Sequence, residues 1–195
     1  MTRSSTIIRL ASQIIAQHEA FFSRPYVDIA GFPTRGYGEL LERKVVPKKH
    51  WGGRAKYGVR YVKPSYCRER GWVNVSREEG QRFLENYVGR DLNYLNGDLN
   101  LSLLSDNKII AILSLMYNIG QSKWRYSTVR KWIIRNPHDY EKITKGFAMW
   151  RLADGKISKG LVRRRREEAE LYCGDGVVET KKEKPKRTRR RGGGR

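Results

Sequence analysis

Apolar residues recur at helical spacing near the start of the chain. The set comprises Ile7, Ile8, Ala11, Ile14 and Ile15, behind the capping candidates Ser4 and Ser5. This spacing predicts an amphipathic helix over residues 5–19, with Glu19 at its C-terminal end. Pro25 stops any continuation of that helix. The next stretch, YVDIAGFPTRGYG, alternates around Ala-Gly-Phe-Pro, a pattern typical of a β-hairpin.

The register of this hairpin decides which side chains face each other. Centred on Gly31, the turn pairs position 28 with position 34 and position 26 with position 36. We therefore expect Asp28 and Thr34 to lie directly opposite each other on one face, with Cβ atoms about 5 Å apart. That spacing leaves room for a water molecule shared by the carboxylate and the hydroxyl.

Beyond the hairpin the pattern changes from irregular to helical. Residues 39–75 are rich in Gly, Lys and Arg and show no sustained period, which indicates short strands and loops. SREEGQRFLENYVGRDLNYL opens with a capping box from Ser76 to Glu79 and predicts a long helix. LSDNKIIAILSLMYNIG is apolar on nearly all sides, as expected of a short helix buried inside a bundle. Further helices are predicted over residues 127–135, 138–150 and 160–172.

These elements predict one mainly helical α+β domain over residues 1–175. A small N-terminal β-hairpin lobe spans residues 20–75 and carries a basic insert at 40–75. A larger helical lobe combines residues 76–175 with the N-terminal helix. With 195 residues and a hydrophobic content of 38%, the chain has enough apolar side chains for a sizeable core.

Charge separates a tail from the body and restricts the class of partner. The chain has 41 Lys and Arg against 20 Asp and Glu, a net charge of +21. Residues 179–195 hold nine basic and two acidic side chains, so we predict a disordered cationic tail over 176–195. Subtracting the tail's +7 leaves +14 on the body, and residues 43–70 alone hold ten basic residues and one acidic. We expect attraction to polyanions such as nucleic acid, anionic lipid or an anionic cell wall.

Cysteine usage and the N-terminal segment favour a cytoplasmic protein. Cys67 and Cys173 are too few for a disulfide framework, and no Cys or His spacing suggests a metal site. We therefore expect free thiols, no metal and no other cofactor. Arg9, Ser12 and Gln13 interrupt the apolar N-terminal segment, which argues against a secretory signal and against a membrane span.

Three polar residues in the first block are candidates for a catalytic site. Glu19 ends an apolar helix, where burial and the negative end of the helix dipole both favour the protonated form that a general acid needs. Asp28 lies in a polar hairpin that favours the ionised form, and Thr34 is placed to hold a water beside it. Two carboxyl groups in unlike environments are typical of glycosidic bond hydrolysis. Spacing alone leaves a second interpretation open, in which these residues are polar side chains of a turn with no catalytic role.

Three sequence blocks resemble one enzyme family, in the family's order. HEAFFSRPYVDIAGFPTRGYG resembles H-E-G followed by Y-x-D-x-x-G-x-x-T-x-G-Y-G of the phage-type lysozymes, the bacteriophage T4-like endolysins of glycoside hydrolase family 24. LSDNKIIAILSLMYNIG with YSTVRKWI resembles the family's core-helix region, and FAMWRLADGKISKGLVRRRREEAELY is similar to its C-terminal block. The matching positions of the first block are His18, Glu19, Tyr26, Asp28, Gly31, Thr34, Gly36, Tyr37 and Gly38.

This resemblance implies a lysozyme-like fold and a muramidase, which cuts the β-1,4 bond from N-acetylmuramic acid to N-acetylglucosamine in peptidoglycan. Glu19 would protonate the leaving oxygen. Asp28 would act as general base on a water that Thr34 helps to position, which gives inversion at the anomeric carbon. Inversion requires carboxyl groups about 6.5–9.5 Å apart, against about 5–5.5 Å for retention.

The resemblance also implies residues that support the three candidates. A basic residue of GLVRRRREEAELY is expected to face Glu19 and tune it as an acid, Arg164 by preference and Arg165 as the second choice. Substrate contacts are expected at Gly38, Leu40 and Tyr117.

Two departures from the family pattern leave open questions. Glu39 follows Gly-Tyr-Gly where the family usually has His, so the pairing made by that His is absent or reversed in charge. The insert at 40–75 is longer than the usual connection, and it either adds a wall-binding surface or forms a solvated loop.

Other classes of function remain alternatives at this point. One is a virion-associated or inactive lysozyme-fold protein that binds nucleic acid or another polyanion through the basic tail and insert. Another is a tail that itself perturbs an anionic envelope, although it has no apolar face for insertion. The endolysin interpretation implies a monomer that stays in the host cytoplasm until a holin gives it access to the wall, or delivery inside a virion.

Overall fold

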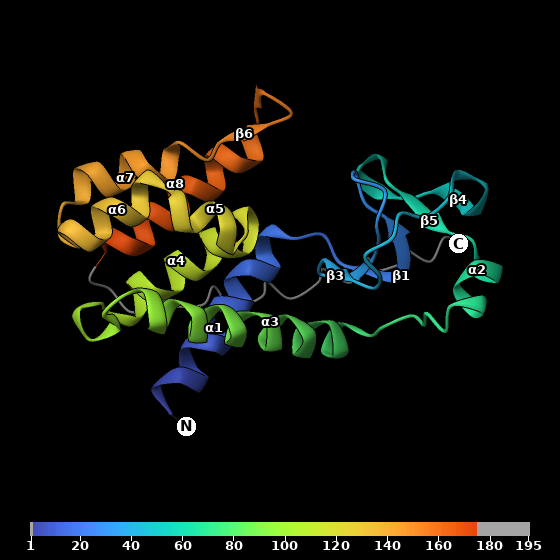
Figure 1. The fold of residues 1–195 in the computed structure, drawn as a ribbon, viewed down its shortest axis with the longest axis horizontal. Helices are drawn as coiled ribbons and strands as arrows, with labels where there is room; N and C mark the ends of the chain where they lie inside the picture. The colour runs from blue at the N-terminus through green and yellow to red at the C-terminus, as the bar shows by residue number, and fades with distance from the viewer. Residues whose placement is uncertain (1, 175–195) are drawn as a thin grey trace, which may run out of the picture.

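The computed structural model describes residues 2–174, so the cationic tail predicted over 176–195 lies outside the described residues. Figure 1 shows a helical lobe at one end and a lobe containing a small sheet at the other, with α3 running between them. The helices are α1 (Arg3–His18), α2 (Pro64–Glu69), α3 (Arg77–Asp98), α4 (Asp106–Ile119), α5 (Gln121–Tyr126), α6 (Thr128–Arg135), α7 (Tyr140–Ala148) and α8 (Lys159–Cys173). This arrangement confirms the mainly helical α+β class predicted from the sequence.

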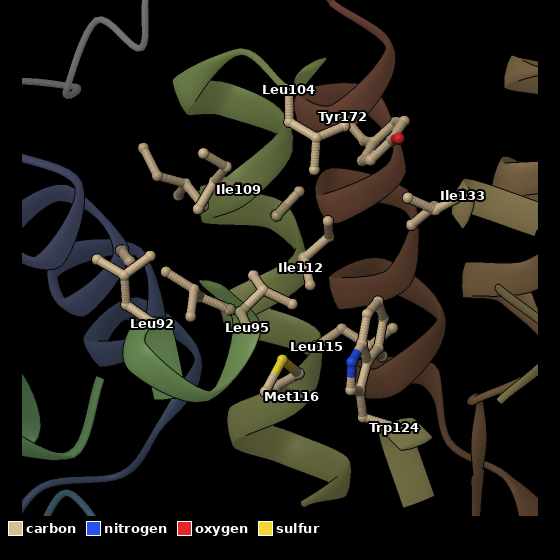
Figure 2. Packing of buried hydrophobic residues seen from close by; sticks show 14 of the residues in the cluster. Leu92, Leu95, Leu104, Ile109, Ile112, Leu115, Met116, Trp124, Ile133 and Tyr172 are labelled. Atoms are coloured by element: carbon tan, nitrogen blue, oxygen red, sulfur yellow. The ribbon is translucent and has the colours of Figure 1, made fainter. Parts of the chain in front are cut away.

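The helical lobe is built around α4, whose residues Ile109 to Met116 are almost completely buried. Its apolar residues point in all directions, so the helix is stable only where other helices surround it. In Figure 2, Leu92 and Leu95 of α3 lie on one side of α4, while Ile133 of α6 lies on the other. α1 and α8 also pack against α4, which brings the start and the end of the described chain to one central helix.

The sheet lobe contains five strands in the order β3-β2-β1-β5-β4, with all neighbours antiparallel. The strands are β1 (Phe22–Val27), β2 (Pro33–Gly36), β3 (Glu39–Leu40), β4 (Trp51–Arg54) and β5 (Arg60–Val62), and a separate hairpin pairs β6 (Leu152–Ala153) with β7 (Lys156–Ile157). The insert therefore supplies two strands that extend the hairpin sheet on the β1 side. It also supplies α2, which closes a small second core with Val27, Val46 and Val62.

A glycine allows the two lobes to approach each other closely. A Cβ atom on Gly80, in the first turns of α3, would lie 2.9 Å from the Phe21 ring and 3.4 Å from the Tyr37 ring. The contact of 2.9 Å is shorter than real Cβ atoms make, so any larger residue here would have to displace the Phe21 ring. The N-terminal part of α3 is thereby seated on the hairpin lobe.

The hairpin register differs from the one expected from the sequence. Tyr26 pairs with Thr34, Val27 pairs with Pro33, and the Asp28 amide donates to the Phe32 carbonyl at 2.9 Å. The turn is thus centred on Ala30, and the expectation that Asp28 and Thr34 are direct partners was wrong. Pattern reasoning also missed α2, α5 and the β6–β7 hairpin, all of them short elements.

The Asp28 side chain explains this register. Its Oδ1 accepts hydrogen bonds from the amides of Ala30 at 2.9 Å and Phe32 at 2.8 Å, so the carboxylate closes the turn that it begins. Gly31 completes the loop at a φ of +91°, a conformation that favours glycine. Aspartate side chains commonly cap turns in this way.

None of the described helices is both long and apolar enough to cross a lipid bilayer.

Candidate active site

Glu19 lies at the junction of the two lobes. It directly follows α1, and its amide donates to the Ile15 carbonyl at 3.1 Å, after which the backbone turns to an extended conformation. Ile7, Ala11 and Ile15 are buried against the helical core, so the end of α1 is fixed in place. The chain then enters β1, which means that Glu19 is held by the helical lobe while facing the sheet lobe.

One buried guanidinium fixes the position of the Glu19 carboxylate. Nη1 of Arg164 on α8 donates to Glu19 Oε1 at 2.7 Å. The same guanidinium donates from Nε to Glu168 Oε1 at 3.0 Å and from Nη2 to the Ser114 carbonyl at 3.0 Å. Arg164 is only 4% exposed, whereas the Glu19 side chain keeps 26% exposure. The arginine favoured by the sequence analysis is therefore the one that contacts Glu19.

Glu168 is the second anchor of this network, and the sequence analysis did not single it out. Its Oε1 accepts from the Ser114 hydroxyl at 2.6 Å, from Arg164 Nε and from Arg165 Nη2 at 2.8 Å. Burial raises the pKa of the Glu168 carboxyl, although both arginines oppose that shift. Burial likewise lowers the pKa of Arg165 to about 10. The spacing of Arg164 and Glu168, four residues apart on a helix, was the available signal.

His18 directly precedes Glu19 in the chain and carries no charge at neutral pH. Its side chain is 8% exposed, and Nε2 is 3.5 Å from Glu167 Oε2. Burial lowers the pKa of His18 to about 4, and the charges of Arg164, Arg165 and Arg163 act in the same direction. The imidazole is therefore neutral at pH 7.

Tyr26 lies on β1, between the two candidate carboxylates in the sequence. The pKa of its hydroxyl is raised to about 12, mainly by burial and also by the negative charges of Asp28 and Glu19. Thr34 is the cross-strand partner of Tyr26, is 5% exposed, and donates its hydroxyl to the Phe32 carbonyl at 3.3 Å. Cross-strand parity places Asp28 and Thr34 on one face as diagonal neighbours instead of direct partners.

A groove of about 1040 Å³ runs between the hairpin lobe and α3. Gly38, Leu40 and Tyr117, the three residues expected to contact substrate, all line it. The Tyr117 hydroxyl donates to the Tyr37 carbonyl at 2.7 Å, and a Cβ on Gly38 would approach that hydroxyl to 3.2 Å. Burial raises the pKa of Tyr117, and the charge of Glu19 adds to the shift. Tyr117 therefore lines the groove and is affected by the charge of Glu19, which does not itself line the groove.

Glu39, found where the family usually has His, forms a local ion pair. Its carboxylate accepts from Arg35 Nε at 2.8 Å, and the same arginine donates to the Val73 carbonyl at 2.9 Å. The Arg35 guanidinium also lies 5.3 Å from the centre of the Phe83 ring. The pair therefore ties β2 and β3 to the segment that leads into α3.

A carboxyl group at the end of α1 and a second carboxyl in the hairpin that follows form an arrangement typical of lysozyme-type glycoside hydrolases. The family model for phage lysozyme matches residues 16–168, so the chain belongs to the phage lysozyme family.

Curated relatives carry related descriptions. The endolysin of Bacillus phage B103 is 26% identical over 98 residues, which are 50% of this chain and 36% of that protein. The endolysin of Acyrthosiphon pisum secondary endosymbiont phage 1 is 30% identical over 102 residues, 50% of this chain and 68% of that protein. The chain thus spans about a third of the first relative and two thirds of the second.

Solved structures share the fold. The endolysin from Escherichia coli O157:H7 phage FAHEc1 has a TM-score of 0.58 at 23% identity, covering 83% of this chain and 89% of that one. The muramidase domain of SpmX from Asticaccaulis excentricus has a TM-score of 0.63 at 17% identity, covering 85% and 96%. At these identities the likeness establishes a lysozyme fold and nothing finer.

The depressed pKa of His18 predicts a dependence of stability on pH. Between pH 6.5 and 4 the unfolded chain binds a proton at this position and the folded chain does not, so acid favours unfolding. This residue should lower the free energy of unfolding by about 2 kcal/mol across that window. Denaturant unfolding at a series of pH values checks this by comparing the unaltered protein with His18→Gln.

The variant should lose less stability between pH 6.5 and 4 than the unaltered protein. Above pH 7.5 the two should differ only by a constant, because both side chains are then neutral. Parallel curves across the acidic window would show that His18 is not held neutral by the fold.

Proposed function

We propose that this protein is an endolysin that hydrolyses the β-1,4 bond between N-acetylmuramic acid and N-acetylglucosamine in bacterial peptidoglycan. The observation that carries the proposal is the Glu19 carboxyl, held by Arg164 at the lobe junction and facing a hairpin that presents Asp28. Family membership and the endolysin descriptions of the curated relatives support it. The groove along α3 is the place for the glycan strand.

Glu19 is the general acid of the proposed reaction. Arg164 occupies Oε1, so the second oxygen of the protonated carboxyl is the one that reaches the glycosidic oxygen. The bond from the anomeric carbon to that oxygen breaks, and the departing 4-hydroxyl takes the proton of Glu19. A fixed carboxyl gives catalysis because proton transfer requires hydrogen-bond distance at the moment of bond cleavage.

Asp28 is the general base, and the backbone fixes its orientation. Two amide donors occupy Oδ1, which leaves the other oxygen for the attacking water. The Thr34 hydroxyl already donates to the Phe32 carbonyl, so it can only accept a hydrogen from that water. The two hydrogens of the water then point to Asp28 and Thr34, and its lone pair points to the anomeric carbon. Asp28 gains the proton that the water loses.

This assignment gives inversion of configuration, because water attacks the face opposite to the leaving group in a single displacement. The proposal includes release to the wall through a holin and action as a monomer in host cell lysis. The charge of the body also fits the alternative, a polyanion-binding protein without activity. If the unaltered protein did not clear peptidoglycan but did bind the wall or nucleic acid, that result would favour the alternative.

Removing the acid or the base should abolish clearing of purified peptidoglycan. Glu19→Gln and Asp28→Asn keep the shape of each side chain but remove proton transfer, so each rate should fall about 10²- to 10⁴-fold. A turbidity assay measures this. Glu170→Gln is the matched control, because Glu170 lies on α8 with an exposed carboxylate that pairs only loosely with Arg166 at 3.6 Å. Clearing by Glu19→Gln at the rate of the control would exclude Glu19 as the acid.

The configuration of the first-formed product tests the division of roles between the carboxyls. Inversion of a β-linked substrate releases the new reducing end as the α-anomer, before mutarotation. Proton NMR during the first minutes of hydrolysis should therefore show an excess of the α-anomer. An initial excess of the β-anomer would show that Asp28 acts as a nucleophile and not as a base.

A further inference from the structure

The insert lengthens the row of side chains that forms the catalytic face of the sheet. Register places Leu40 beside Thr34, Thr34 beside Tyr26, and Tyr26 beside Tyr61. Cross-strand partners project from the same face of a sheet. A single row therefore crosses four strands, from the groove at Leu40 through Thr34 to Tyr61 on β5, which belongs to the insert.

Aromatic contacts connect this row to an exposed tyrosine. The Phe22 ring packs on Tyr26 at 4.3 Å between ring centres, and it meets the rings of Tyr61 and Tyr57 edge-on at 6.4 Å each. Phe22 is buried, and Tyr57 is 79% exposed. Four aromatic rings thus lead from the candidate catalytic site to the surface of the insert.

Tyr57 lies in the turn that joins β4 to β5. Its φ of 58° lies in the left-handed region, where bulky side chains are rare. Gly58 follows with a φ of 77°, and two successive positive φ values are what a tight hairpin turn requires. The conformation of Tyr57 therefore belongs to the turn, and the feature that suggests a ligand is its ring, which is 79% exposed and covers only the edge of Phe22.

A cation stands over the same row. The Arg24 guanidinium lies 4.5 Å from the centre of the Tyr61 ring and is exposed. Within residues 2–174 no carboxylate lies within ion-pair distance of Arg24. In the same residues, Arg70 is the only one of the ten insert cations that pairs with a carboxylate, that of Glu42. The surface formed by Tyr57, Tyr61, Phe22 and Arg24, here called the platform, therefore carries uncompensated positive charge.

We propose that Tyr57 and Arg24, supported by Tyr61 and Phe22, form an additional glycan-binding subsite outside the central groove. The Tyr57 ring stacks on the apolar face of a sugar, and Arg24 pairs with a carboxylate on the same strand. An arginine fork suits a carboxylate because two N–H groups match its two oxygens. The inference rests on the proposed function, since a peptidoglycan strand offers both sugar rings and carboxylates.

The continuous row favours a glycan over nucleic acid as the occupant. A strand that passes the candidate carboxylates would meet Tyr61 and Arg24 next along the same face. A nucleic acid held by charge alone would need neither the register with Tyr26 nor the exposed ring of Tyr57.

The test compares long and short glycan substrates in Tyr57→Ala and Arg24→Gln. With long soluble peptidoglycan strands, each variant should raise KM about 3- to 10-fold and leave kcat unchanged. With a fragment of two disaccharide units, which on this proposal is too short to reach Tyr57 and Arg24, neither variant should change KM. Blocking the carboxylates of the long strands should erase the effect of Arg24→Gln and preserve that of Tyr57→Ala.

Arg125→Gln and Tyr126→Ala are the matched controls. They alter an exposed arginine–tyrosine pair on α5. The Arg125 guanidinium lies 6.0 Å from the centre of the Tyr126 ring, and Tyr126 is 74% exposed. Both should keep the KM of the unaltered protein. Direct binding to the same strands in a Glu19→Gln background provides a readout that does not depend on activity, and the platform variants should weaken it.

The outcomes separate the two proposals. Unchanged KM and affinity in both platform variants would overturn the subsite and leave the proposed function intact. An unaltered protein that binds the strands but never hydrolyses them would overturn the proposed function, and weaker binding by the platform variants would still support the subsite. Equal weakening of binding to DNA and to glycan strands would show a general charge effect and overturn the subsite.

Discussion

The structure depends on the Arg164 guanidinium held between Glu19 and Glu168. A buried cation is costly unless each of its donors finds a partner, and here the three partners come from the end of α1, from α4 and from α8. Removing Glu168, which pairs with Arg164 and Arg165 at once, would leave buried positive charge without its partner, at a cost of about 3–5 kcal/mol. The same interaction that joins these helices therefore also decides where the Glu19 carboxyl points.

The sheet lobe provides the other carboxyl group of the proposed site, and a different set of hydrogen bonds holds it. Asp28 is held by two backbone amides of its own turn, so its position is set by the hairpin and not by a long-range partner. Gly80 allows α3 to seat against that lobe, and Tyr117 links the groove to Glu19. The proposed acid and the proposed base are thus each held in place by a different lobe.

Periodicity predicted the elements whose burial determines their structure. The all-apolar helix around Ile112 and the long capped helix from Ser76 follow from sequence alone, because a single buried face or a capping box suffices to define them. The short helices α2 and α5 were missed, since six residues carry too little pattern. The hairpin register was misplaced because parity does not reveal that the Asp28 side chain itself closes the turn.

The sequence singled out candidate residues for the site but not the hydrogen-bond network that holds Glu19. The motif singled out Glu19, Asp28 and Thr34 as candidates, and the preference for Arg164 over Arg165 as the residue facing Glu19 agrees with the contact seen. Glu168 was signalled only by its spacing to Arg164, and Ser114 could not be assigned, because only tertiary packing brings α4 against the last helix. The aromatic platform on the insert likewise becomes visible only when β5 is placed beside β1.

The most direct test of the account is the kcat of Arg164→Lys on peptidoglycan, with Arg163→Lys as the control on the exposed side of α8. Lysine keeps the positive charge but cannot donate to Glu19, Glu168 and Ser114 at once. If the guanidinium positions the acid, kcat should fall about 10- to 100-fold while circular dichroism shows a folded protein. KM should stay within about twofold, because the groove is untouched. A folded Arg164→Lys protein with the kcat of the control would contradict the account.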